Sequence, residues 1–269
     1  MTTTIWEDKR VDTITQSIIG KLKEIEAAYE VTIPLAIESG SRGWGFAAAN
    51  ADYDCRFIYV QKPERYLSVS EVDEFIEFEL NETFDIKGYD LKRALKYIMK
   101  SQAAINEWLS SNVVYIINEP IVKRLRGLAA EFFNPIPVSY HYLSLAKKTL
   151  AEITSTEDAR IKKYFYVLRP IANLNFIHLF RRMPYMEYNR TLAAISTPSE
   201  VQIAINALTE QKMMMFENDR IPAHGLLIGY FKTEIERFDN LLKDMRHDKK
   251  TEYTALDEAF RATIKDVWK

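Results

Sequence analysis

The chain has 269 residues, 47% of them hydrophobic and 28% charged, so it is long enough to bury one large core or two smaller ones. Its single cysteine, Cys55, excludes an intrachain disulfide and a zinc site built from cysteines. Proteins that wrap long nucleic acids usually carry an excess of basic residues, whereas this chain has a net charge of −2. Any contact with nucleic acid should therefore be local.

The first part of the chain is expected to combine strands and helices. In chain order the predicted elements are a helix at 12–30, strands at 31–40, 53–60 and the second half of 72–80, and a helix from residue 91. Helices are indicated by apolar residues at three- and four-residue steps, and strands by short apolar or alternating runs. Pro34 in the first strand favours an edge position or a bulge. Residues 41–49 predict a short helix or turn, and Asp90 stands where a helix N-cap would stand.

Beyond about residue 118 the strand patterns nearly vanish and helical periodicity takes over. The predicted helices are 121–131, 138–155, 158–181, 199–215, 224–246 and, more weakly, 252–267. We therefore predict an α/β domain at residues 1–118 followed by an all-helical domain at residues 119–269. Pro170 should kink its helix. The sequence shows no signal-peptide pattern and no apolar run of the ~18 residues that a membrane helix needs, which predicts a cytoplasmic protein without membrane contact.

Two carboxylates stand at the start of the second strand. Asp52 and Asp54 are two residues apart, so they should point to the same face, with Arg56 following on that face. Adjacent carboxylates repel each other and need a cation, and Mg²⁺ or Mn²⁺ is bound by one or two carboxylates together with substrate phosphates. Two such ions would clamp the attacking and leaving oxygens of a phosphoryl displacement.

A Gly-Ser pair precedes these carboxylates. Gly40 permits close approach of the backbone, and the helix start that follows offers N–H groups to a phosphate. Ser41 adds a hydroxyl donor, and Arg42 or Arg56 could meet the remaining phosphate charge. Each element alone is usually plain turn chemistry. Together, in this order and between two predicted strands, they indicate a nucleotide-binding site.

The order Gly-Ser, a gap of ten residues, then Asp-x-Asp resembles the signature of the DNA polymerase beta nucleotidyltransferase superfamily. The longer text GSRGWGFAAANADYDCRFIYV is similar to one branch, the predicted nucleotidyltransferases associated with RNA-ligase-based RNA repair. The similarity extends to FDIKGYDLKRALKYI, INEWLSSNVVY and KKYFYVLRPIANLNFI, and so covers most of the first 185 residues. The chain departs from a common form of the branch at AAANAD, where a loop with Ser-Pro is usual, and at Tyr89, where Trp is common.

The resemblance implies a polymerase-beta-like domain with a mixed sheet, followed by a helical domain. It also implies a third acidic residue on a neighbouring strand, for which Asp90 is the first choice and Asp85 the second. Asp52, Asp54 and Asp90 would then be catalytic and hold the two metal ions. The alternative for Asp90 is a plain helix cap.

In this superfamily the helical domain closes over the triphosphate and supplies cations. The resemblance assigns that role to Lys163 and Arg169, with Lys147 as a further candidate, and Tyr166 could stack on a base. The alternative for the lysines is a solvated basic face of a surface helix. The adjacent Arg181 and Arg182 could contact a nucleic-acid acceptor, or could only complement a helix dipole.

These residues predict transfer of a nucleoside monophosphate from an NTP to an acceptor hydroxyl, with release of pyrophosphate. The resemblance suggests an RNA 3′ end as acceptor, for example that of a damaged tRNA. A small-molecule or protein acceptor and a non-catalytic RNA-binding subunit are the alternatives. The sequence has no phosphate-loop, metalloprotease or esterase motif, and it gives no sign of the preferred NTP, the number of nucleotides added or the oligomeric state.

Overall fold

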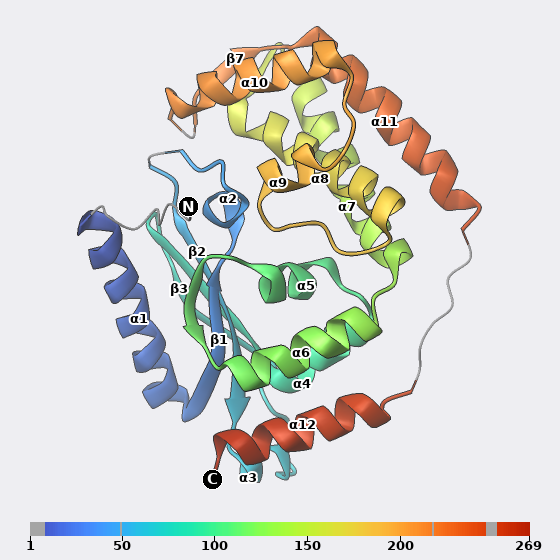
Figure 1. The fold of residues 1–269 in the computed structure, drawn as a ribbon. Helices are drawn as coiled ribbons and strands as arrows, with labels where there is room; N and C mark the ends of the chain where they lie inside the picture. Colours follow the sequence, from blue (N-terminus) through green and yellow to red (C-terminus); the bar gives the residue numbers. More distant parts are fainter. Residues whose placement is uncertain (1–8, 49, 217, 246–251) are drawn as a thin grey trace, which may run out of the picture.

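The computed structural model describes residues 9–48, 50–216, 218–245 and 252–269 (Figure 1). Its main sheet has the strand order β3-β4-β2-β1-β5. The strands are β1 (Val31–Glu38), β2 (Tyr53–Gln61), β3 (Phe75–Leu80), β4 (Phe84–Asp90) and β5 (Val114–Ile117). β2 and β4 run parallel and the other neighbours antiparallel, so the sheet is mixed, as the resemblance implied.

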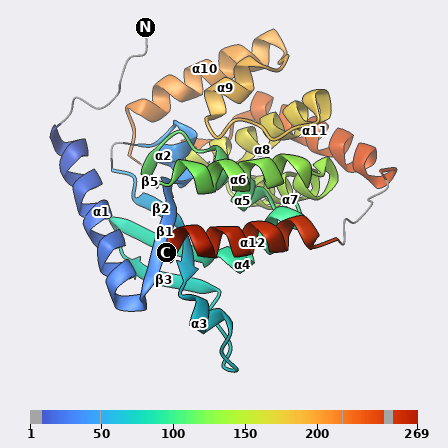
Figure 2. The same ribbon diagram turned by 60° about the horizontal axis from the view of Figure 1, so that its bottom comes forward.

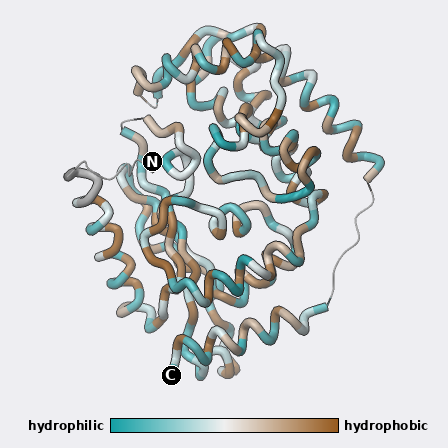
Figure 3. The backbone as a smooth tube through the Cα atoms, in the orientation of Figure 1, coloured by the Kyte–Doolittle hydropathy of each residue, from teal (hydrophilic) through white to brown (hydrophobic). Residues whose placement is uncertain are grey.

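Helices cover both faces of this sheet. They are α1 (Lys9–Tyr29), α4 (Leu91–Met99), α5 (Ala103–Ser110), α6 (Glu119–Glu131) and α12 (Thr254–Val267), with the short helices α2 (Gly40–Trp44) and α3 (Pro63–Tyr66) in the connections. Alternate residues of β2 point to opposite faces of the sheet. Cys55 and Phe57 are buried in a cluster with α1, whereas Ile58 and Val60 are buried in a cluster with α4, α5 and α6. Figure 3 shows the hydrophobic residues concentrated along the central strands.

Pro34 lies in β1, between β2 and β5, so the expected edge position is wrong. The expected bulge is confirmed, because the register of β1 against β2 shifts between Thr32 and Leu35. A bulge leaves one residue outside the ladder, which accommodates a proline without an N–H group. The carbonyl of Pro34 still accepts a hydrogen bond from the Asn118 N–H at 2.7 Å.

The second part of the chain is helical, as predicted, apart from two strands of three residues. It contains α7 (Pro135–Thr154), α8 (Ile161–Phe180), α9 (Tyr188–Ala193), α10 (Ser199–Met213) and α11 (Gly225–Lys243), with β6 (Asp158–Arg160) paired to β7 (Arg220–Pro222). Helix α8 continues through Pro170. Within the described ranges, no helix combines the length and the apolar character needed to cross a membrane.

The last helix returns to the sheet. Figures 1 and 2 show α12 beside α4 and α6, away from the other C-terminal helices. Leu256 and Ala259 are buried with the core on that side of the sheet, and the indole Nε1 of Trp268 donates to the carbonyl of Gln61 at 2.8 Å. The division at residue 118 stays a prediction, and both α6 and α12 share the hydrophobic core of the sheet.

Candidate active site

The turn at Gly40 is packed directly against the Asp54 carboxylate. Gly40 has φ +57°, and a Cβ placed on it would lie 1.8 Å from Oδ2 of Asp54. The Ser39 N–H donates to the carbonyl of Asp54 at 2.8 Å, which holds the turn against β2. Both the backbone conformation and the available space therefore require glycine at position 40. Ser41 is buried at the start of α2, and its role as a phosphate donor stays a prediction.

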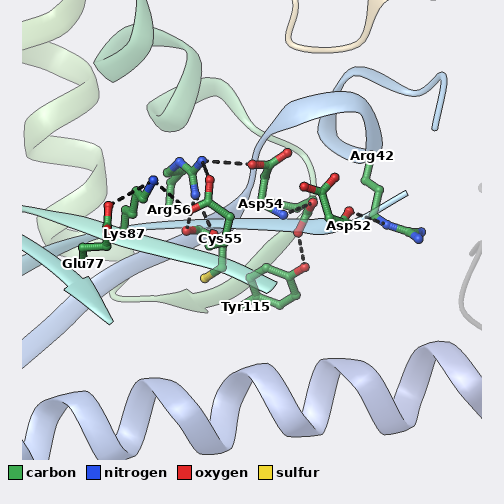
Figure 4. A network of polar contacts seen from close by, with 10 residues as sticks. Arg42, Asp52, Asp54, Cys55, Arg56, Glu77, Lys87 and Tyr115 are labelled. Atoms are coloured by element: carbon green, nitrogen blue, oxygen red, sulfur yellow. Dashed lines mark hydrogen bonds and ion pairs between the residues drawn. The ribbon is translucent and has the colours of Figure 1, made fainter. Parts of the chain in front are cut away.

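Asp54 faces a second carboxylate on the neighbouring strand. β2 and β4 pair in parallel with Asp54 opposite Asp85. Arg56 lies between the two: its Nη2 is 2.9 Å from Oδ1 of Asp54 and 2.7 Å from Oδ2 of Asp85 (Figure 4). Lys87 adds a further positive charge, because its Nζ is 3.2 Å from Oδ1 of Asp85. Arg56, expected to bind nucleotide phosphate, thus balances two carboxylates in this structure.

Asp90 is not part of this group, which corrects the first choice for the third acidic residue. It pairs with Tyr59, five positions further along the strand than the Asp54–Asp85 pair, or about 16 Å away at ~3.3 Å per residue. Its carboxylate is fully buried and accepts hydrogen bonds from the Lys92 N–H and the Tyr66 hydroxyl, each at 2.7 Å. The helix-cap alternative therefore describes Asp90, and the second choice, Asp85, lies beside Asp54.

Asp52 and Asp54 lie on the same side of the strand, as predicted (Figure 4). The Asp52 carboxylate takes part in no hydrogen bond or ion pair within the part of the chain that the structure describes. Burial raises the pKa of Asp54 to about 6; the positive charge of Arg56 opposes this shift and the negative charge of Asp52 adds to it. A metal cation at this pair would favour the ionised form.

Arg42 is used to hold the loop that carries Asp52. Its Nε donates to the carbonyl of Asp52 at 3.0 Å and its Nη2 to the carbonyl of Ala51 at 2.6 Å. Its guanidinium also lies over the ring of Tyr53, 3.9 Å from the centroid. Arg42 was expected to meet phosphate, and the structure instead shows it positioning the backbone in front of β2.

Glu38 is an active-site neighbour that sequence reasoning missed. It is buried at the end of β1, where its Oε1 accepts the Asp54 N–H at 2.9 Å and its Oε2 accepts the Tyr115 hydroxyl. Burial raises the pKa of Glu38 to about 7, although both hydrogen bonds oppose the shift. The available signal was a carboxylate that ends an otherwise apolar strand, immediately before the Gly-Ser turn.

Helix α8 reaches the active-site turn through Trp44, the last residue of α2. Arg169 is buried with its guanidinium 4.3 Å from the Trp44 ring centroid, and its Nη2 is 2.8 Å from Oε1 of Glu107. Tyr166 meets the same indole edge-on at 5.7 Å. Arg169 therefore has a buried carboxylate as its partner, which differs from the expected exposure to a triphosphate.

The two predicted lysines lie in surface ion pairs of the helical part. Lys163 is 2.6 Å from Glu152, and Lys147 is 2.6 Å from Asp239. Both pairs are partly exposed. These contacts favour the alternative of a solvated basic helix face over a role as triphosphate ligands.

The carboxylate oxygens around Asp54 supply only some of the ligands that a hard divalent cation needs. No group of three or more His, Cys, Asp or Glu side chains that could hold a metal ion exists among the described residues. Arg56 separates Asp54 from Asp85, which leaves Asp52 and Asp54 as the adjacent oxygen donors. Mg²⁺ is held by one or two carboxylates plus phosphate oxygens, so these two residues fit a metal that arrives with its nucleotide.

The chain resembles known proteins along most of its length. The model of a family described as the RNA repair pathway DNA polymerase beta family matches residues 14–262. An uncharacterized protein of Bacillus subtilis (strain 168), YcgL, is 35% identical over 254 residues, which is 94% of this chain and 98% of that protein. A crystal structure of a nucleotidyltransferase-like protein from Exiguobacterium sibiricum 255-15 covers 93% of this chain and 80% of its own at 12% identity. Its TM-score of 0.27 is too low to support a conclusion.

Proposed function

Because the chain belongs to the RNA repair pathway DNA polymerase beta family, we propose that it is a metal-dependent nucleotidyltransferase. It transfers a nucleoside monophosphate from an NTP to an acceptor hydroxyl and releases pyrophosphate. The observation that carries the proposal is the contact between the Gly40 turn and the Asp54 carboxylate, with Asp52 beside it. A glycine turn closed onto a partly exposed carboxylate has no evident purpose in folding alone.

Each group near the turn has a proposed task. Asp52 and Asp54 would hold two Mg²⁺ or Mn²⁺ ions together with the phosphate oxygens, and the ions would supply charge neutralisation for the phosphoryl group. The turn at Gly40 and Ser41 supports the triphosphate. Asp85, in place of Asp90, accepts the proton of the acceptor hydroxyl. The acceptor oxygen bonds to the α-phosphorus, the bond from that phosphorus to the bridging oxygen breaks, and pyrophosphate leaves.

Glu38 and Arg56 position these groups. Glu38 fixes the backbone N–H of Asp54, and Arg56 balances the charge that Asp54 and Asp85 share. Such fixed surroundings matter because phosphoryl transfer depends mainly on positioning and on charge neutralisation.

An RNA 3′ end, for example of a tRNA, is the proposed acceptor, because the family is defined by an RNA repair pathway. The net charge of −2 favours a second candidate, a small-molecule or protein acceptor, since neither requires a broad basic surface.

The test is incubation of the full chain with Mg²⁺ or Mn²⁺, each labelled NTP in turn and total tRNA, resolved on a denaturing gel. Metal-dependent label on RNA, lost in Asp54→Asn and in Asp52→Asn/Asp54→Asn, is expected. Asp244→Asn, at an exposed aspartate that ends α11, is the matched control and should retain activity. Label on protein would select the second candidate, and full activity of Asp54→Asn would contradict the proposed metal site.

A further inference from the structure

A cavity of about 500 Å³ opens between α5, α6 and the turn that follows α8. Part of its lining is apolar, with Leu109 and Ala129 buried and Phe133 and Met183 half-buried. The remainder includes three exposed arginines, Arg126 on α6 and Arg181 and Arg182 after α8. None of the lining residues is acidic.

The described residues supply no counter-charge to these arginines. The Arg126 Nε donates to the carbonyl of Leu109 at 2.7 Å, and the Arg182 guanidinium lies 5.3 Å from the Phe176 ring centroid and 5.6 Å from that of Tyr185. These partners orient the guanidinium groups but carry no negative charge. None of the three arginines forms an ion pair with any carboxylate in the described parts of the chain. Positive groups that converge on one cavity without a counter-charge favour an anionic ligand.

The dipole of α8 does not account for this arrangement. It could explain Arg181, the C-cap residue, and its neighbour Arg182. Arg126 comes from a different helix and points its charge at the same cavity. The apolar lining beside the arginines, including the ring of Phe133, suits a ligand that carries both phosphate and a flat apolar group.

We propose that this cavity binds the acceptor, a single-stranded RNA segment, with its phosphates on Arg126 and Arg181 and a base against Phe133. Arginine recognises phosphate through two parallel hydrogen bonds, and an unpaired base can stack on an aromatic side chain. The inference rests on the proposed nucleotidyltransferase function and names the place of its second substrate. The NTP itself does not fit here, because its metal ions need carboxylates and the cavity lining has none.

The cavity wall continues into the active-site turn. Ser110 lines the cavity, and the next residue, Ser111, donates from Oγ to the carbonyl of Glu38 at 3.0 Å. The next residue, Asn112, donates to Oε1 of Glu187, four residues after Met183, at 3.0 Å. The segment that continues from the cavity wall therefore contacts Glu38, whose side chain accepts the Asp54 N–H. In the proposal, the acceptor bound in the cavity extends from there toward the Gly40 turn.

The test is the affinity of the full chain for a fluorescein-labelled 12-nucleotide single-stranded RNA, measured by anisotropy in EDTA without NTP. Arg126→Ala/Arg181→Ala should bind about tenfold more weakly, and the slope of log affinity against log salt should fall by about 1.4, or ~0.7 for each lost phosphate contact. Arg181→Ala alone should weaken binding about threefold; its side chain forms no hydrogen bond or ion pair within the described ranges, so the fold should be kept.

Arg65→Ala/Arg261→Ala is the matched control, because it removes the same charge from exposed arginines on α3 and α12. It should change the affinity less than twofold. Equal weakening by both double variants, or no weakening by the cavity variant, would overturn the inference. Cavity-dependent binding without any nucleotide transfer would uphold the cavity while contradicting the proposed function. Nucleotide transfer to RNA, combined with RNA binding that does not depend on the cavity arginines, would uphold the proposed function and contradict the cavity as the acceptor site.

Discussion

Replacement of Gly40 by alanine tests two reasons for a glycine in this turn: the left-handed backbone conformation and the close contact with the Asp54 carboxylate. Gly40 has φ +57° and Gly45, five residues later, has φ +84°, so alanine at either position adopts a left-handed conformation. That conformation costs about 1–2 kcal/mol for a residue with a Cβ. At about 2–4 °C per kcal/mol, each variant should lose roughly 2–8 °C in melting temperature.

The two glycines differ in what surrounds them. A Cβ at Gly40 would lie 1.8 Å from Oδ2 of Asp54, whereas a Cβ at Gly45 has nothing within 4 Å. Relief of the contact at Gly40 requires the Asp54 carboxylate or the turn to move by about 1.7 Å, to an ordinary separation of about 3.5 Å. A displacement of ~1 Å in a reacting geometry can lower a rate about 100-fold. We therefore expect Gly40→Ala to lose at least ~100-fold in nucleotide transfer, and Gly45→Ala to stay within about threefold of the wild type.

The assay pairs thermal unfolding with transfer rates on the same preparations, and Mn²⁺ titration calorimetry gives a second readout of the Asp52–Asp54 pair. Similar melting temperatures with very different transfer rates would support the contact with Asp54 as the cause. If Gly40→Ala transferred nucleotide as fast as Gly45→Ala, the packing of the turn on the carboxylate would have no part in the chemistry. If both variants were equally inactive, backbone conformation would explain the glycines instead.

Two further predictions concern the carboxylates around this turn. Asp85→Asn should abolish most transfer, because Asp85 lies opposite Asp54 on the neighbouring strand. Asp90→Asn should keep transfer within about twofold, since an asparagine can still cap α4. Glu38→Gln should change the pH dependence of stability. The pKa of Glu38 is raised from 4.5 to about 7 by burial, so the folded state retains a proton that the unfolded state releases. Glu38 should contribute a fall in stability of roughly 3 kcal/mol as the pH rises from 4.5 through 7. Glu38→Gln should remove that contribution, so the difference in unfolding free energy between the variant and the wild type should change between pH 5 and pH 8, as measured by urea unfolding.

Clear results would contradict each of these. Transfer that survives in Asp85→Asn but fails in Asp90→Asn would restore Asp90 as the third acidic residue. Unfolding free energies of the wild type and Glu38→Gln that vary in parallel with pH would show that Glu38 does not carry the proton.

Several features of the protein could be predicted because their cause is local in the sequence. The alternation of β2 follows from the two-residue period of a strand, and it correctly placed Asp52 and Asp54 on one side. The helices of the second part follow from apolar residues at helical spacing. Gly40 stood out because a turn that makes a close approach leaves no room for a side chain.

Other features depended on which distant segments meet. The choice between Asp85 and Asp90 was set by the register of β4 on β2, strands that start 31 residues apart. Nothing in the local sequence around either aspartate encodes that register. β4 itself was not recognised as a strand, because its alternating charges and Gly88 give only a weak strand pattern.

The partners of the charged side chains were also decided only by the tertiary structure. Sequence reasoning treated Arg42, Arg56 and Arg169 as free cations for phosphate, and each has a protein partner: backbone carbonyls, two carboxylates and a buried glutamate, respectively. A charge is attracted to whatever opposite charge or dipole the fold brings near it, which the residue type alone does not reveal. Arg126 shows the converse, since only the packing of α6 beside α5 and the end of α8 leaves its charge uncompensated in a cavity. Periodicity and motif order thus determined the elements and the neighbouring carboxylates Asp52 and Asp54, whereas strand register and helix packing determined which charged side chains have an oppositely charged partner.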